Sequence, residues 1–320
     1  MTRAPKEFDL SGLTRQSLHG RESLVQLEQL GKTHEKGASF AQFLDALPDQ
    51  LAARDLKKVV DAVVKAREAG RPVMLGMGAH PIKVGLSPII IDLMRRSIVT
   101  SLSFNGAVLV HDYEVAVAGQ TSEDVAAALK DGSFGVTLET GRDFARFVEE
   151  GHADGLGLAE AVGRGIRSLD APYAQFSLLA ACHELDLPAT AHVALGTDVI
   201  HLAPELDFAK VGELAGRDFK RLITLVDDLE GGVYINLGSA VIMPEIFLKA
   251  VSAARNLGSA LSQITTVNFD MIRHYRPLTN VVTRPTANGG AGYAITGHHE
   301  IMLPLLAAAV IERMDGAGAP

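Results

Sequence analysis

Histidines and acids gather in short segments that follow β-rich runs of the sequence. They occur in Gly76-Met-Gly-Ala-His80, in His111-Asp-Tyr-Glu114, in Gly196-Thr-Asp198 with His201 nearby, and in Gly297-His-His-Glu300. Imidazole and carboxylate groups can transfer a proton, hold a polar substrate or coordinate a metal ion. If the preceding runs are parallel strands, these groups lie at the edge of the sheet where α/β proteins bind ligands.

The β-rich runs that must position these groups alternate with stretches of helical periodicity. They are residues 72–76, 98–104, 189–195, 233–237, 264–269 and 292–296. Strands that alternate with helices favour a parallel sheet, because each parallel connection must cross the sheet and a helix makes that crossover. We therefore expect an α/β fold with a doubly wound, mostly parallel, Rossmann-like sheet and helices on both faces.

The chain divides into an arm and one domain. Residues 1–38 are polar and weakly periodic, which predicts an arm laid over the domain or over a neighbouring subunit. Residues 39–320 carry the alternating pattern and predict a single α/β domain. Within that domain, Thr121-Ser-Glu-Asp124 has the spacing of a capping box and predicts a helix that begins at Val125.

The composition argues against several classes of protein. Lys and Arg total 30 against 38 for Asp and Glu, so the net charge of −8 provides no basic excess for nucleic acid or an anionic membrane. The single cysteine, Cys182, lies in an apolar run and excludes an internal disulfide or a zinc site made of several thiolates. No apolar run approaches the roughly 20 residues of a membrane span, and the N-terminus lacks a signal peptide. We expect a cytoplasmic protein.

Two features suggest a nucleotide site and a base. Gly76-x-Gly78 and Gly238 follow apolar runs, where glycine lets a dinucleotide pyrophosphate approach the backbone but also suits any tight turn. Glu245 follows Pro244, a residue typical of the first turn of a helix. Its carboxylate then lies near the positive end of that helix, either as a functional group or as a favourable dipole contact.

Four short motifs occur in the order found in one known family. They are Ala194-Leu-Gly-Thr-Asp198, Leu237-Gly-Ser-Ala-Val-Ile242, Asn268-Phe-Asp270 and Pro304-Leu-Leu306. They resemble motifs of deoxyhypusine synthase and homospermidine synthase, NAD-dependent enzymes that dehydrogenate spermidine and transfer its aminobutyl group. The resemblance extends from about Phe40 to the C-terminus. It implies an NAD-binding domain and a homotetramer with active sites between subunits.

The resemblance assigns residues to the cofactor but not to the family's chemistry. It implies NAD-binding positions at His80, Asn105, Gly106, Asp198, Gly238, Thr265, Thr266, Asp270, His298 and Glu300. The family's base histidine is replaced near Pro244 and Glu245. Lys249 is the last lysine and the chain has no tryptophan, so the family's late Trp-Gly-Lys segment is absent. Deoxyhypusine synthesis through a lysine imine is therefore not expected.

The leading hypothesis is an NAD-dependent transformation of a small amine or alcohol, with Glu245 as the base. His111 and Glu114 would orient the substrate or share proton transfer. One alternative is a metal-dependent hydrolase or lyase that uses the His/Asp/Glu cluster, although the spacing matches no familiar metal signature. Another is a nucleotide-binding protein without catalytic activity.

Overall fold

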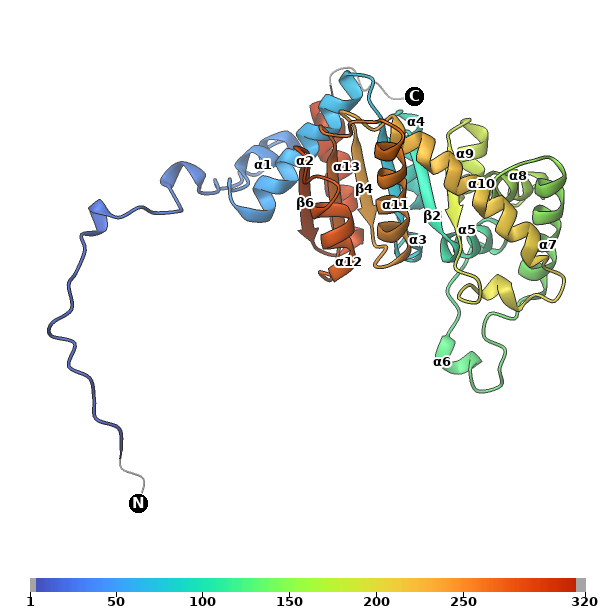
Figure 1. Cartoon of the computed structure of the whole chain (residues 1–320), viewed down its shortest axis with the longest axis horizontal. Helices are drawn as coiled ribbons and strands as arrows, with labels where there is room; N and C mark the ends of the chain where they lie inside the picture. Colours follow the sequence, from blue (N-terminus) through green and yellow to red (C-terminus); the bar gives the residue numbers. More distant parts are fainter. Residues whose placement is uncertain (1–3, 315–320) are drawn as a thin grey trace.

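The computed structural model describes residues 4–314 and confirms the expected α/β fold, with an all-parallel sheet between layers of helices (Figure 1). The strands are β1 (Val73–Met77), β2 (Ser101–Asn105), β3 (Ala189–His192), β4 (Val233–Leu237), β5 (Thr265–Asp270) and β6 (Ala291–Thr296). Their order is β3-β2-β1-β4-β5-β6, and each neighbouring pair is parallel. The order reverses between β1 and β4, so the crevice beyond their carboxyl ends is the topological switch point.

Helices connect the strands as the periodicity predicts. They are α1 (Phe40–Ala46), α2 (Leu51–Glu68), α3 (His80–Lys83), α4 (Ser87–Arg95), α5 (Gly106–Ala118), α6 (Val125–Ala128), α7 (Leu138–Ala153), α8 (Leu158–Ser168), α9 (Leu178–Glu184), α10 (Phe208–Asp227), α11 (Ile242–Asn256), α12 (Tyr275–Pro277) and α13 (His299–Arg313). A π-helical segment, Leu278–Thr283, follows α12. The capping box expected at residues 121–124 is not formed. Asp124 is itself the cap of α6, because its side chain accepts from the backbone N–H of Ala127.

The sheet is buried on both faces. In β1, Val73 and Leu75 belong to the larger core cluster, whereas Met74 belongs to a second cluster formed with α10 and α11. Successive side chains of a strand point to opposite faces, so this division shows helices packed on each side. Because both faces of the sheet are buried, the strands are continuous apolar runs in the sequence and do not alternate between apolar and polar residues.

A buried carboxylate joins α5 to α9. Asp112 accepts hydrogen bonds from the hydroxyl of Ser177 (2.5 Å) and from the backbone N–H groups of Leu178 (2.7 Å) and Leu179 (3.0 Å). The two N–H groups belong to the first turn of α9, where backbone N–H groups have no acceptor within the helix. Burial raises the pKa of Asp112 to about 6, although its hydrogen bonds oppose the rise.

A second buried carboxylate protects the free edge of the sheet at β3. Asp218 of α10 accepts from the backbone N–H of Ala191 in β3 (2.8 Å) and of Ala159 in α8 (2.9 Å). An edge strand otherwise presents unpaired backbone groups that can recruit another strand. Burial raises the pKa of Asp218 to about 7, against the opposing effect of these hydrogen bonds.

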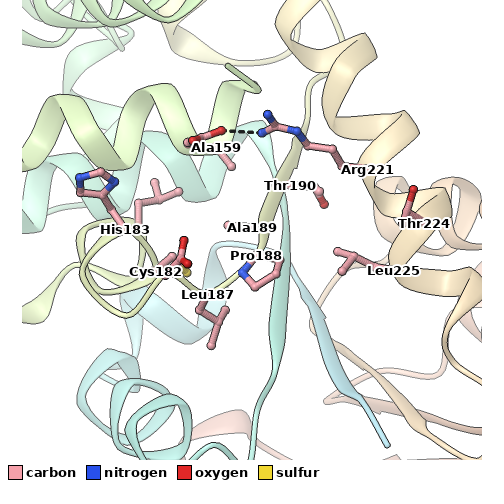
Figure 2. A pocket seen from close by; sticks show the side chains of 13 residues that line it. Ala159, Cys182, His183, Leu187, Pro188, Ala189, Thr190, Arg221, Thr224 and Leu225 are labelled. Atoms are coloured by element: carbon pink, nitrogen blue, oxygen red, sulfur yellow. Dashed lines mark hydrogen bonds and ion pairs between the residues drawn. The ribbon is translucent and has the colours of Figure 1, made fainter. Parts of the chain in front are cut away.

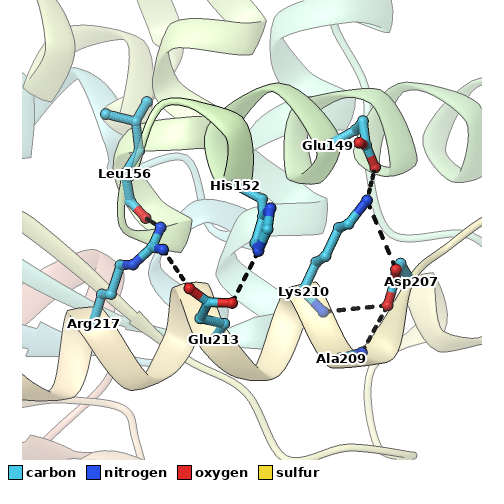
Figure 3. A network of polar contacts seen from close by, with 8 residues as sticks. All are labelled: Glu149, His152, Leu156, Asp207, Ala209, Lys210, Glu213 and Arg217. Atoms are coloured by element: carbon cyan, nitrogen blue, oxygen red, sulfur yellow. Dashed lines mark hydrogen bonds and ion pairs between the residues drawn. The ribbon is translucent and has the colours of Figure 1, made fainter.

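Surface ion pairs join α7 to α10 (Figure 3). His152 of α7 lies 2.9 Å from a carboxylate oxygen of Glu213 in α10, and Lys210 of α10 pairs with Glu149 of α7. Exposed pairs of this kind contribute little stability each, typically below about 1 kcal/mol. The helices of this layer are therefore held mainly by their buried faces.

The N-terminal residues extend away from the domain (Figure 1). Residues 4–38 contain only short 3-10 turns at Leu18–Gly20 and Leu27–Gln29, and large side chains such as Phe8 and Leu24 are exposed. The change to regular structure at Phe40 falls next to the boundary expected at residue 38. Within residues 4–314, no helix combines the length and apolar character needed to cross a membrane.

Candidate functional site

Most of the predicted site residues lie at the carboxyl edge of the sheet. These are His80, Asn105, Gly106, His111, Glu114, Asp198, Gly238, Asp270, His298 and Glu300, which end or follow the strands or lie on the helices that come next. The structure separates the others from this group. Thr265 and Thr266 begin β5, about 16 Å along the strand from Asp270 at about 3.3 Å per residue. The hydroxyl of Thr266 is used internally and donates to the carbonyl of Val281 (2.7 Å).

A cavity of about 220 Å³ opens at this edge, beyond the carboxyl ends of β2 and β3. It is lined by residues that follow three strands: Lys83 after β1, Ala107, Val110, His111 and Glu114 after β2, and Thr197, Asp198 and Val199 after β3, with Ser122, Glu123, Val125 and Phe134 from the intervening loop. Carboxylates outnumber cationic groups on its wall. The cavity therefore favours a small ligand that carries positive charge or several hydrogen-bond donors.

Beside the cavity wall, Thr121 joins the two predicted residues of α5. Its hydroxyl donates to Glu114, so the Nδ1–H of His111 donates to the Thr121 oxygen (2.6 Å). His111 also lies 3.6 Å from Glu114. Burial opposes ionisation of Glu114, but its interactions with His111 and Thr121 outweigh this effect and lower its pKa. Sequence reasoning placed His111 and Glu114 here but assigned Thr121 to a helix cap.

Asp198 lies against the end of β2. A Cβ atom at Gly106, the first residue of α5, would stand 2.0 Å from its Oδ2, so only glycine leaves room for this carboxylate. Oδ2 is buried and has no hydrogen-bond partner within residues 4–314. Burial raises the pKa of Asp198. The carboxylate thus faces the positive end of α5, whose first turn is also capped by the side chain of Asn105 (3.2 Å to the Val108 N–H).

His201 holds the loop that carries Asp198. Its Nδ1 accepts from the backbone N–H groups of Gly196 and Asp198, each at 3.2 Å. The ring also stacks on Phe208. The position of Asp198 is therefore determined by the protein rather than by solvent.

Two histidines meet at the switch point. Nδ1 of His80, at the start of α3, lies 2.8 Å from Nδ1 of His299, at the start of α13. Nε2 of His299 lies 3.2 Å from the backbone carbonyl of Phe269 in β5. Gly238, after β4, has φ +65°, and a Cβ there would stand 2.7 Å from the His299 ring. The glycine predicted to approach a cofactor thus already makes room for His299.

His299 was not among the predicted site residues, although its neighbours His298 and Glu300 were. The structure exposes those two, with His298 Nδ1 3.8 Å from Glu300, and buries His299. The signal in the sequence is the adjacent pair of histidines at the start of a helix, since one of two such residues can point to solvent and the other to the sheet. Which of the two faces the sheet depends on the angle at which α13 leaves β6.

Glu245 lies in an ion-pair cluster between α11 and α12. Its carboxylate contacts Lys249 (2.5 Å) and Arg276 (3.4 Å) and accepts from the side-chain amide of Asn280 (2.8 Å). The hydrogen bond from Lys249 is the main cause of its lowered pKa. This environment favours a stable carboxylate, which is a weak base. Its place in the first turn of α11, with Pro244 before it, is as the sequence indicated.

The cluster required by the metal alternative is not assembled in residues 4–314. No group of three or more His, Cys, Asp or Glu side chains there is arranged to hold a metal ion. The histidines at the carboxyl edge are instead divided among separate contacts: the His80–His299 pair, His111 with Thr121, His201 with its own loop and His298 near Glu300. We find no geometric support for a shared metal centre in this part of the chain.

A second cavity, of about 370 Å³, lies at the opposite end of β3, between α8, α9 and α10 (Figure 2). Arg221 of α10 pairs with Glu160 of α8 on its wall (2.7 Å). Cys182 also lines it but is buried, and burial raises the pKa of its thiol. A buried thiol with a raised pKa is not an activated nucleophile.

Comparison with known proteins identifies the fold. No family model and no curated protein matches the sequence. A solved structure of a putative deoxyhypusine synthase from Entamoeba histolytica is similar over 89% of this chain and 97% of that one, with a TM-score of 0.55 and 10% identity. The cyanobacterial arginine dihydrolase ArgZ gives 0.51 and 16% over 83% of this chain. AgrE, solved as a ternary complex with ornithine and NAD⁺, gives 0.51 and 15% over 83%.

These likenesses support the resemblance to deoxyhypusine synthase at the level of fold. The chain spans about a third of the length of ArgZ and AgrE, 33% and 34% respectively. A shared fold hosts many activities, so the function must be argued from the site.

Proposed function

We propose that this protein binds NAD at the carboxyl edge of the sheet and catalyses an NAD-dependent transformation of a small amine or alcohol. The observation that carries the proposal is the unpartnered carboxylate oxygen of Asp198, which follows β3 and lies against Gly106 at the end of β2, in a sheet of order β3-β2-β1-β4-β5-β6. Sheets of this order bind dinucleotides at the switch point, and an acid near the end of the second strand accepts from the ribose hydroxyls.

The chain's own residues fit such a cofactor at this position. Asp198 supplies an acceptor without a partner among the described residues, and Gly106 leaves the space for it. A carboxylate here also favours NAD over NADP, because it would repel the additional 2′-phosphate. When bound, NAD⁺ would supply a hydride acceptor.

The substrate would occupy the cavity lined by Lys83, His111, Glu114 and Asp198. Glu114 is held as a carboxylate by Thr121 and His111, so it can pair with the ammonium of an amine or accept from a hydroxyl. His111, fixed through Nδ1, keeps Nε2 free to share in proton transfer. The acidic wall supports an amine over an anionic substrate.

Binding of the cofactor is tested by titrating the protein with NADH, NAD⁺ and NADP⁺ and recording thermal stability and NADH fluorescence. A ligand that binds only the folded state raises stability by RT ln(1 + [L]/Kd), about 2.7 kcal/mol at 100 Kd. We expect a shift with NADH and NAD⁺, and a loss of at least about tenfold in affinity for Asp198→Ala. The matched control is Asp228→Ala, an exposed aspartate at the amino edge of the sheet. Equal affinities in both variants would contradict the proposed site.

The predicted role of Glu245 as base has its own test. Glu245→Gln should lower turnover of a small amine with NAD⁺ while NADH affinity is kept, if the carboxylate takes the proton. Unchanged turnover would remove Glu245 from the mechanism and leave it as the centre of the contact between α11 and α12. Spermidine, putrescine and short diols are suitable first probes.

The alternatives predict other outcomes of the same titration. A shift with divalent metal alone would favour the hydrolase or lyase reading. A shift with NAD but no turnover of any amine or alcohol would favour a nucleotide-binding protein without catalysis.

We also propose a homotetramer, as the resemblance implies. Light scattering coupled to gel filtration should then give four times the 34.0 kDa of the chain. A monomer or a dimer would contradict this proposal without affecting the cofactor site on one chain.

A further inference from the structure

The contacts of His299 determine which of its nitrogens carries a proton. A backbone carbonyl can only accept, so the Nε2 that lies 3.2 Å from the Phe269 oxygen must be the donor. Burial is the main cause of the lowered pKa of His299, which keeps the ring neutral near pH 7. A neutral imidazole has one donor and one acceptor. Nδ1 of His299 is therefore an acceptor.

The state of His80 follows from that of His299. Nδ1 of His80 lies 2.8 Å from this acceptor and must carry the proton in the pair. The remaining nitrogen of a neutral His80, Nε2, then has a free lone pair. His80 is half-buried at the carboxyl end of β1, one helical turn before Lys83, which lines the cavity.

We propose that His80, rather than Glu245, is the proton-accepting group of this site and that His299 is its positioning residue, holding His80 in the Nδ1–H form with Nε2 free. The inference rests on the proposed function for the origin of the proton. The same logic operates in catalytic triads, where a third group fixes the tautomer of the base. Here a backbone carbonyl, relayed through a second imidazole, takes the place of the carboxylate.

The proton transfer involves one bond on each partner. An N–H bond of a substrate ammonium or the O–H bond of an alcohol breaks, its electron pair stays on the nitrogen or oxygen, and the proton forms a bond to Nε2 of His80. The positive charge then rests on the half-buried His80, because Nε2 of His299 remains bonded to a carbonyl that cannot take a proton. Asp270 and Glu300 are the acidic groups that face this pair and favour a positive charge there.

Tautomers are measured directly by long-range ¹H–¹⁵N correlation spectra of the full chain labelled with ¹⁵N-histidine and without any ligand. Signals are assigned by the loss of peaks in His80→Gln and His299→Gln. We expect His80 as Nδ1–H with an unprotonated Nε2, and His299 as Nε2–H. A wild-type His80 in the Nε2–H form, or a doubly protonated His299 at pH 7, would overturn the proposal.

Two variants of His299 separate positioning from packing. In His299→Leu the acceptor is lost, so His80 should change to the Nε2–H form that free imidazole prefers. In His299→Gln the side-chain amide can still donate to Phe269 and its oxygen can still accept from His80, so the Nδ1–H form should be kept. His298→Gln, which changes the exposed neighbour, is the matched control and should leave the His80 signals unmoved. If His299→Leu does not fold, the wild-type and His299→Gln spectra still decide.

NADH titration of the same samples keeps this inference distinct from the proposed function. If the wild-type protein does not bind NADH but shows the expected tautomers, the proposed function fails while the arrangement of the pair stands. If NADH binds and the tautomers are the reverse, the positioning role fails while the cofactor site stands. Loss of the Nδ1–H form of His80 in His299→Gln as well as in His299→Leu would also contradict the positioning role of His299.

Discussion

Two regions of the molecule bury carboxylates, and they treat them differently. In the helical layer beside β3, Asp112 and Asp218 each accept at least two hydrogen bonds from backbone N–H groups of other elements. Within the described residues, Oδ1 of Asp218 also lacks a hydrogen bond but lies 3.9 Å from the guanidinium of Arg221, whereas Oδ2 of Asp198, at the carboxyl edge, has no hydrogen-bond partner. All three have a raised pKa because of burial. The direction of the shift therefore does not distinguish them.

The distinction lies in what the carboxylate contacts. A buried acceptor whose donors are other parts of the same chain serves the fold, because each donor would otherwise be unsatisfied. A buried acceptor without a donor, beside a cavity, serves the fold poorly and is available to a ligand. Substitutions in the two regions should accordingly affect different measurements.

The largest expected effect is on stability in the helical layer. Asp112→Ala removes the acceptor for the Ser177 hydroxyl and for two N–H groups of α9, and each unsatisfied donor costs about 1–3 kcal/mol. We expect the free energy of unfolding in urea to fall by at least about 3 kcal/mol. Asp228→Ala, an exposed control, should stay within about 0.5 kcal/mol. A similar small loss for Asp112→Ala would show that α9 does not depend on this carboxylate.

A smaller effect depends on pH at Asp218. The folded protein keeps this proton up to about pH 7, whereas the unfolded chain loses it near 3.8, so the stabilisation is fully present below pH 3.8 and is lost as the pH rises to about 7. Asp218→Asn does not titrate but can still accept both backbone bonds. When the pH is lowered from 7.5 to 4.5, the free energy of unfolding of the wild type should rise by roughly 1–3 kcal/mol relative to that of this variant, measured with urea. A difference that does not vary with pH would mean that Asp218 has an ordinary pKa when folded.

Asp198 provides the contrast in stability. Asp198→Ala removes Oδ2, which has no partner within residues 4–314, together with the cap that the carboxylate makes on the backbone N–H of His201, so the free energy of unfolding should fall by no more than about 2 kcal/mol. Urea unfolding without ligand measures this, alongside the loss of NADH affinity. A destabilisation as large as that of Asp112→Ala would place Asp198 with the structural carboxylates.

The smallest expected effect on stability concerns a buried polar group in the core, away from the carboxyl edge. The hydroxyl of Tyr234 is buried without a partner in the described residues, and its ring stacks on Phe247 at 3.7 Å between centroids. No cavity among those found at the carboxyl edge contacts it. Tyr234→Phe keeps the stacking, so thermal unfolding should shift by an amount equivalent to less than about 1 kcal/mol, with stabilisation as the expected sign. A clear loss of stability would reveal a hydrogen bond made by that hydroxyl.

Much of the fold could be predicted from the sequence. The predicted runs correspond to the strands, with ends that differ by no more than three residues, and the glycine and histidine segments do follow their carboxyl ends. The predicted pair of His111 and Glu114 was found together because both lie on α5, three residues apart. Thr265 and Thr266 lie at the opposite end of β5 from Asp270, a separation that the family resemblance alone did not indicate.

By itself, the sequence determined the local features of this protein: which runs form strands, where turns occur and which side chains share one helix. These depend on the spacing of apolar residues and on turn chemistry within a few positions. Only the tertiary structure decided that His80 meets His299, 219 positions later in the chain, and that Asp198 rests on Gly106. Such contacts arise from the order of the strands and the angles at which helices leave the sheet, which are set by packing across the whole domain.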